Sequence, residues 1–108
     1  MKSRLRSLRL TSPPMRIARL TVDFHLAGCR SLKDKRRRLA KLRDKFGQKT
    51  HVSVCESDHA DSWQRAQWSF VVGAGAGRVV EQTLNEIEQY VALSVDAQVL
   101  SMQRQWLD

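Results

Sequence analysis

The segment ESDHADSWQR contains the side chains best suited to chemistry in this sequence. Asp58, His59 and Asp61 could ligate a metal ion or act as an acid–base group, because carboxylates and imidazole commonly fill both roles. The sequence offers no second cluster of such ligands, and His25 and His51 fall on separate predicted strands. We therefore favour a structural loop and predict no catalytic residue, no metal and no cofactor. A hydrolase built on this segment is the least favoured alternative.

A second segment, CRSLKDKRRRLAKLRDKF, is rich in positive charge. Ten lysine and arginine residues lie between Arg30 and Lys49, counting both ends. Neighbouring cations on one helix face repel each other by a few tenths of a kcal/mol per pair, so this density favours a polyanionic partner whose counterions are released on binding. The alternative is a solvated helix face, which would be more stable with both charge signs. The expected nucleic-acid-binding residues are Arg30, Lys33, Arg36, Arg37, Arg38, Lys41 and Lys45.

Two shorter motifs carry less information. GAGAG precedes a predicted helix, where free N–H groups can bind anions, but it matches neither GxGxxG nor GxxxxGK[ST]. We predict a tight turn there. Cys29 lies near a helix start, which can lower the pKa of a thiol, although isolated thiols are usually inert.

These residues are positioned by elements that the hydrophobic pattern predicts. Alternating apolar residues indicate strands, and apolar residues about 100° apart indicate helices. Ser31 can cap the first helix and Gly47 can end it. A β-bulge is expected near Val99 and Leu100, where the alternation weakens. The predicted elements are strands over residues 15–26, 51–56, 66–72 and 95–106, and helices over residues 32–46 and 78–93.

The order β-α-β-β-α-β predicts a ferredoxin-like α+β fold. Right-handed crossovers then require a four-stranded antiparallel sheet of order 4-1-3-2, with both helices on one face. The core face holds most of the aromatic residues, which argues against base stacking on the open face. That open face is polar and could equally serve a homodimer.

This topology brings the start of the first helix beside the loop after the second strand. Lys35 falls within the apolar stripe of the helix, where an unpaired ammonium group would be costly. We therefore predict a structural ion-pair cluster at this end of the sheet, with Trp63 covering the end of the core. The members of the expected cluster are Lys35, Glu56, Asp58, Asp61 and Arg65.

Length and composition limit the alternatives. A chain of 108 residues suits one domain, which we place at residues 15–108, after a basic and disordered segment over residues 1–14. The net charge of +8 is uneven: residues 1–49 carry sixteen cations and three acids, whereas residues 50–108 carry three cations and eight acids. No apolar run is long enough to span a membrane, and no apolar wedge accompanies the cations to favour membrane binding. Two cysteines suit a reducing cytoplasm.

The sequences GCRSLKDKRR and VSVCESDHADSWQRA resemble those of DUF503, the YlxP-like family of small bacterial proteins of unknown function. The resemblance covers residues 16–106 and implies a ferredoxin-like fold. Genes of the family often lie near genes for translation and ribosome assembly, which implies an RNA context, and the family has no known catalytic residues. The longer amino-terminal segment and the GAGAG turn depart from the common pattern.

We therefore expect a small cytoplasmic protein that is not an enzyme and that binds ribosomal RNA or a ribosomal particle. The first helix would lie along the phosphates, without visible base specificity. The main alternative is a protein–protein interaction module, in which the basic helix docks an acidic partner.

Overall fold

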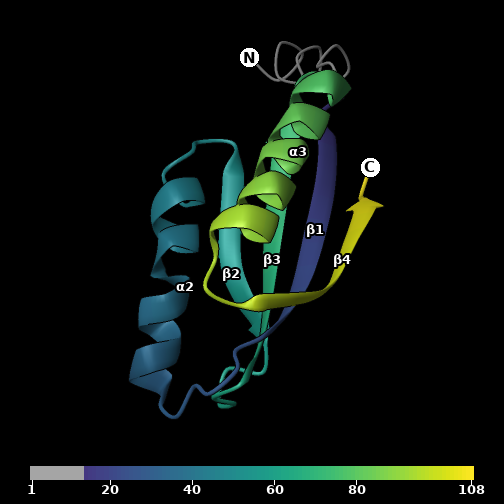
Figure 1. The fold of residues 1–108 in the computed structure, drawn as a ribbon. Helices are drawn as coiled ribbons and strands as arrows, with labels where there is room; N and C mark the ends of the chain where they lie inside the picture. Colours follow the sequence, from purple (N-terminus) through teal and green to yellow (C-terminus); the bar gives the residue numbers. More distant parts are fainter. Residues whose placement is uncertain (1–13) are drawn as a thin grey trace, which may run out of the picture.

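The computed structural model describes residues 14–108, which form one four-stranded antiparallel sheet and two helices (Figure 1). The strand order is β2-β3-β1-β4, the same order that the sequence predicts when it is read from the other edge. The ferredoxin-like α+β fold is therefore confirmed. The elements are β1 (Arg16–His25), α2 (Leu32–Phe46), β2 (Val52–Asp58), β3 (Arg65–Ala74), α3 (Gly77–Ser94) and β4 (Gln98–Trp106).

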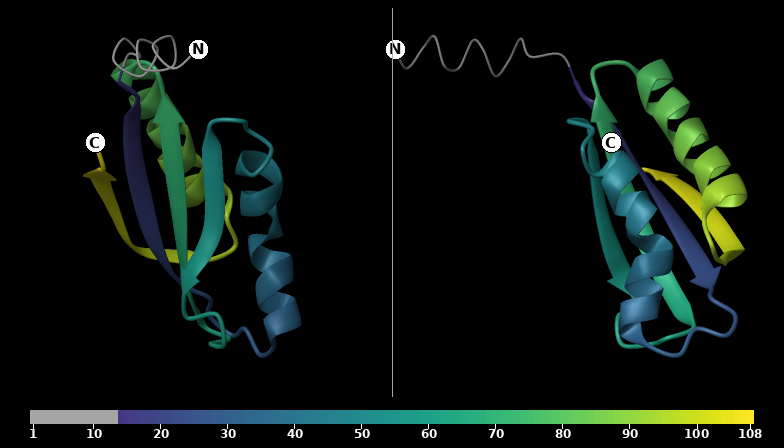
Figure 2. Two further views of the ribbon diagram at one scale, coloured as in Figure 1. Left: turned by 180° about the vertical axis from the view of Figure 1, so that it is seen from behind. Right: turned by 60° about the vertical axis from the view of Figure 1, so that its left-hand side comes forward.

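Both helices cover the same face of the sheet, and the other face stays open (Figure 2). The alternation of β1 explains this arrangement, because Leu20, Val22 and Phe24 are fully buried while the residues between them are only partly buried. The helices add their apolar stripes to the same core, including Leu39 from α2 and Leu84 from α3. Burial of this kind stabilises the fold by about 1.5–3 kcal/mol for each large apolar side chain.

The ends of α2 follow the expected signals. The Ser31 hydroxyl accepts a hydrogen bond from the Asp34 N–H at 3.0 Å, which satisfies one of the free donors at the helix start. The helix ends at Phe46, where the N–H of Gly47 donates to the Arg43 carbonyl.

The bulge predicted in the last strand is present. Asp23 of β1 pairs with Ser101, whereas the next residue, Phe24, pairs with Val99, so Leu100 is the extra residue. A single extra residue changes which face the following side chains occupy. The break in alternation near this point is therefore a real feature of the strand.

The loop after β1 and the loop before β3 meet at one end of the sheet, as the topology requires. The Leu26 N–H donates to the Gln64 carbonyl at 2.9 Å, and the Gln64 side chain donates to the Cys29 carbonyl at 3.4 Å. These bonds bring the start of α2 to the β2–β3 loop. The disordered segment expected over residues 1–14 lies outside the described residues, apart from Pro14. In the described part of the chain, no helix has the length and apolar character needed to cross a membrane.

Candidate nucleic-acid interface

Helix α2 is amphipathic, with a buried side toward the sheet and a cationic side toward solvent. Its fifteen residues include eight lysines and arginines but only two aspartates. The buried side consists of Lys35, Leu39, Leu42 and Phe46. Because the apolar residues fix the rotation of the helix, most of the remaining cations are directed outward.

Four of the expected binding residues are exposed and, among the described residues, contact neither an acidic partner nor an aromatic ring. Arg30 precedes the helix, and Lys33, Arg36 and Lys41 lie on it. Within residues 14–108, none of the four forms an ion pair with a carboxylate. Their charge is therefore not neutralised by the described fold and remains available to an outside partner.

Arg37 is exposed but paired. Its guanidinium forms an ion pair and hydrogen bonds with the carboxylate of Asp34, one turn earlier on α2. The hydrogen bond from Arg37 lowers the pKa of the Asp34 carboxyl below its ordinary value, so this carboxylate stays charged at neutral pH. The Arg37 side chain is still 71% exposed, and a phosphate would compete with Asp34 for it.

Lys45 and Arg43 lie beside aromatic rings. The Lys45 ammonium is 5.1 Å from the centre of the Tyr90 ring, and the Arg43 guanidinium is 5.7 Å from the centre of the Trp68 ring. Cation–π contacts at exposed sites contribute about 0.5–1 kcal/mol. Both residues remain exposed, so these contacts orient the cations without burying them.

Arg38, another of the expected nucleic-acid-binding residues, is mostly buried and paired. Its side chain is only 11% exposed and donates to the carbonyls of Ala27 and Asp96 at 2.9 and 3.0 Å. It also pairs with the Asp96 carboxylate at 3.3 Å. Arg38 therefore joins α2 to the loop after β1 and to the loop before β4. Both loops supply carbonyls that need a donor, and this guanidinium provides it.

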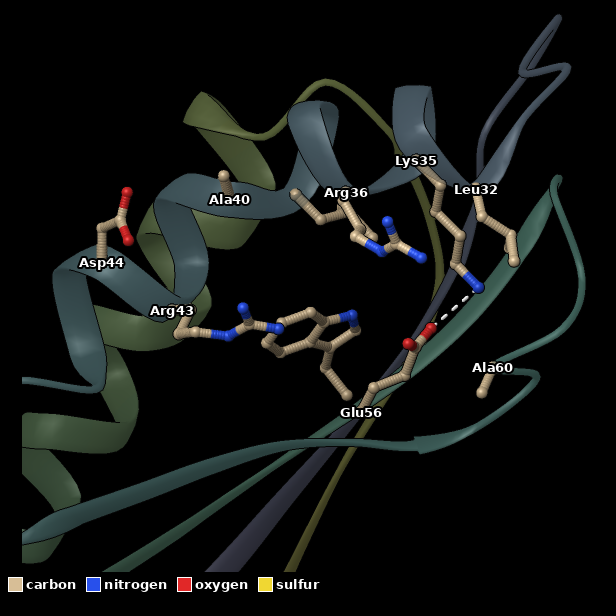
Figure 3. A pocket seen from close by; sticks show the side chains of 10 residues that line it. Leu32, Lys35, Arg36, Ala40, Arg43, Asp44, Glu56 and Ala60 are labelled. Atoms are coloured by element: carbon tan, nitrogen blue, oxygen red, sulfur yellow. Dashed lines mark ion pairs between the residues drawn. The ribbon is translucent and has the colours of Figure 1, made fainter.

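Lys35 lies inside the fold, as its position in the apolar stripe predicts. Its side chain is 4% exposed, and its ammonium group donates to the carbonyls of His59 and Ser62, each at 2.8 Å. The Glu56 carboxylate lies 2.8 Å away as an ion pair (Figure 3). Two hydrogen bonds and one ion pair therefore hold this ammonium group inside the fold.

The larger ion-pair cluster expected around Lys35 is therefore wrong beyond Glu56. Asp58 instead accepts the N–H of His59 at 2.7 Å, and its carboxylate lies 3.8 Å from the His59 ring. In the described part of the chain, Asp61 and Arg65 form no ion pair, and both are exposed. Two backbone carbonyls take the positions that we assigned to these carboxylates.

Two further details of the β2–β3 loop differ from expectation or were not visible in the sequence. Trp63 is 51% exposed and does not cover the end of the core. His59 adopts a left-handed backbone conformation with φ of 61°, which is uncommon for a residue with a side chain. The hydrogen bond that the His59 N–H donates to the Asp58 carboxylate supports this conformation. In it, the His59 carbonyl accepts a hydrogen bond from Lys35. His59 therefore acts here through its backbone.

A pocket of about 160 Å³ lies between α2 and strands β2 and β3 (Figure 3). Lys35, Arg36 and Arg43 line it from the helix, and Glu56 and Trp68 line it from the sheet. The alternation along β3 predicts Trp68 on the core face, and this residue is 4% exposed there. No sequence signal marks the pocket, because it depends on small residues that face each other from distant segments.

A comparison with protein families matches this chain over residues 17–104 to the family described as "Protein of unknown function (DUF503)". A comparison with curated proteins found no match. The family match covers most of the 108 residues, so the chain belongs to the DUF503 family.

Proposed function

We propose that this DUF503 protein is a cytoplasmic RNA-binding protein that is not an enzyme, and that its target is ribosomal RNA or a ribosomal particle. The surface that would bind is the outer side of α2 together with Arg30. The single observation that supports the proposal best is a group of four exposed cations on this surface that have neither an acidic partner nor an aromatic contact among the described residues, Arg30, Lys33, Arg36 and Lys41.

The spacing of these cations suits a phosphate backbone. Lys33, Arg37 and Lys41 follow each other at four-residue intervals and so share one face of α2, with side chains about 5–6 Å apart. Binding of phosphates would relieve the repulsion between them and release counterions. A purely solvated face gains nothing from this arrangement, because it lacks the alternating charges that stabilise exposed helices.

Salt dependence tests the proposal. If these four cations each meet one phosphate, the logarithm of the association constant for a structured ribosomal RNA fragment should fall with the logarithm of salt concentration with a slope of about −3.6. Fluorescence anisotropy on the full-length protein between about 50 and 300 mM salt would measure it. Absence of binding at the lowest salt concentration, or a slope near zero, would contradict the proposal.

The same assay can examine an acidic protein partner. Polyglutamate carries spaced negative charges but no phosphate and no base. Tight binding of polyglutamate together with no binding of RNA would favour the protein–protein interaction module. We expect tighter binding of RNA than of polyglutamate, because phosphate contacts can combine charge with directed hydrogen bonds from arginine.

A further inference from the structure

The pocket beside α2 contains a polar group that the fold leaves without a partner. The indole N–H of Trp68 is buried and has no hydrogen-bond acceptor among the described residues. The Glu56 carboxylate also lines the pocket, and its buried Oε2 atom forms the ion pair with the Lys35 ammonium at 2.8 Å. Buried polar groups are nearly always hydrogen bonded. The wall of the pocket thus contains one N–H without a partner among the described residues, beside a carboxylate that is paired with Lys35.

The shape and walls of the pocket suit a flat group. Its volume of about 160 Å³ is below the roughly 300–1,000 Å³ of pockets for drug-sized ligands, which leaves room for a ring system and little more. Leu32 and Leu39 line the pocket with apolar surface. The small side chains of Ala40 and Ala60 leave open space (Figure 3).

Two guanidinium groups line the pocket. Arg36 and Arg43 extend from α2 toward it (Figure 3). Unpaired RNA bases commonly stack on arginine planes while their edges form hydrogen bonds. Arg36 also belongs to the unpaired cations of the proposed interface, so a strand bound along α2 would pass the pocket.

We propose that this pocket binds one unpaired RNA base, with guanine as the preferred base. The inference rests on the proposed RNA binding and adds base selectivity to it. The Trp68 N–H would donate to the guanine O6, and the Glu56 carboxylate would accept from the two neighbouring donors, N1–H and N2–H. Among the four bases, guanine alone offers two adjacent donors beside an acceptor on its Watson–Crick edge.

Short single-stranded RNAs test the selectivity. The probes are 12-residue uridine oligonucleotides in which one central base is uracil, guanine, adenine or cytosine. The wild-type protein should bind the guanine probe about tenfold more tightly than the uracil probe, which is the discrimination of one good bidentate contact. Trp68→Phe removes the donor and keeps a ring, and Ala40→Leu fills the pocket from an exposed helix position. Both variants should lose the preference but keep the affinity for the uracil probe.

Trp63→Phe is the matched control, because Trp63 is exposed and does not line the pocket. It should keep the guanine preference. If the wild-type protein binds all four probes equally, or if Ala40→Leu keeps the preference, the pocket assignment is wrong while RNA binding stands. If no probe and no structured RNA binds, both the proposed function and this inference fail.

An NMR titration distinguishes binding of an RNA base from binding of a free nucleotide. In ¹H–¹⁵N spectra the indole N–H signal of Trp68, assigned from its loss in Trp68→Phe, should shift on addition of the guanine probe. Guanosine monophosphate alone should shift it only at much higher concentration, since it lacks the phosphate contacts along α2. Saturation by the mononucleotide at the same concentration as by the probe would contradict an RNA base and identify a free nucleotide site. An unmoved signal with bound probe would exclude the pocket.

Discussion

Lys35 and Lys41 have the same side chain and lie on the same helix, but only Lys35 is buried. The ammonium of Lys35 satisfies two loop carbonyls and one carboxylate, so it fastens α2 to the β2–β3 loop. Lys41 has no such partner in the described part of the chain. Lys35 therefore stabilises the fold, whereas Lys41 is available to bind a partner.

Lys35→Ala should lower the free energy of unfolding by about 3 kcal/mol, because the change leaves Glu56 without its counterion and two partly buried carbonyls without a donor. Lys41→Ala should change it by no more than about 0.5 kcal/mol, as is usual for an exposed side chain. Urea unfolding of the two variants measures the difference. Equal midpoints would show that the Lys35 contacts do not stabilise the protein.

Arg38→Gln should lower the stability of the fold without changing RNA binding, whereas replacement of an exposed cation on α2 should weaken RNA binding without lowering stability. The substitution removes bonds from a mostly buried guanidinium to the loops at Ala27 and Asp96, which should cost about 1–3 kcal/mol in urea unfolding. The salt slope for RNA should stay unchanged. A slope reduced by about 0.9 with unchanged stability would mean that Arg38 leaves Asp96 and binds a phosphate.

Helix α2 shows how much of an element can be predicted from sequence. Its cap at Ser31, its end at Gly47 and its buried side all follow from local signals, because they depend on residues close in the chain. The partners of Lys35 and Arg38 do not follow. They are backbone carbonyls on loops, as far away as Asp96, and a carbonyl has no sequence signature.

The same reasoning explains the error in the acidic loop. Charge complementarity favoured Asp58 and Asp61 as partners of Lys35, since only side chains can be read from a sequence. The left-handed conformation at His59 presents carbonyls to Lys35. The pocket beside Trp68 could not be predicted for a related reason. It forms where small residues from distant segments leave space between α2 and the sheet, and such a space has no sequence signature.

Asp34→Asn should strengthen RNA binding through α2. Asp34 is the acid that pairs with Arg37, and its lowered pKa keeps it charged at neutral pH and down to mildly acidic pH. Asparagine cannot hold the guanidinium by charge, so Arg37 becomes available and the magnitude of the salt slope should rise by about 0.9. Asp44→Asn is the control, since Asp44 has no ion-pair partner among the described residues. Equal effects of both substitutions would indicate a general charge effect.

Charge is unevenly distributed along the whole chain. Residues 1–49 contain sixteen of the nineteen lysines and arginines, whereas residues 50–108 contain eight of the eleven acids. Three of these acids, Glu81, Glu86 and Glu88, lie on α3. A polyanion should therefore approach from the α2 side, because the potential around a protein steers association.

The open face of the sheet differs from the α2 side. Its polar side chains bind one another: Asp23 accepts from Gln67 at 3.3 Å and from Ser101 at 3.1 Å, and the hydroxyl of Ser69 donates to Ser57 at 2.8 Å. These bonds leave few free groups for an RNA. A homodimer through this face stays a prediction, and sedimentation of the free protein would measure it.

The most direct test of the account compares two triple variants with the same change in net charge. Arg30, Lys33 and Lys41 are replaced by glutamine on the proposed surface, and Arg19, Arg65 and Arg78, all exposed and outside α2, are replaced in the control. Both proteins should stay folded. The first should lose about 2.7 from the salt slope for structured ribosomal RNA and most of its affinity, while the control keeps nearly the wild-type slope. Equal losses, or unchanged binding by the first variant, would contradict an interface on α2.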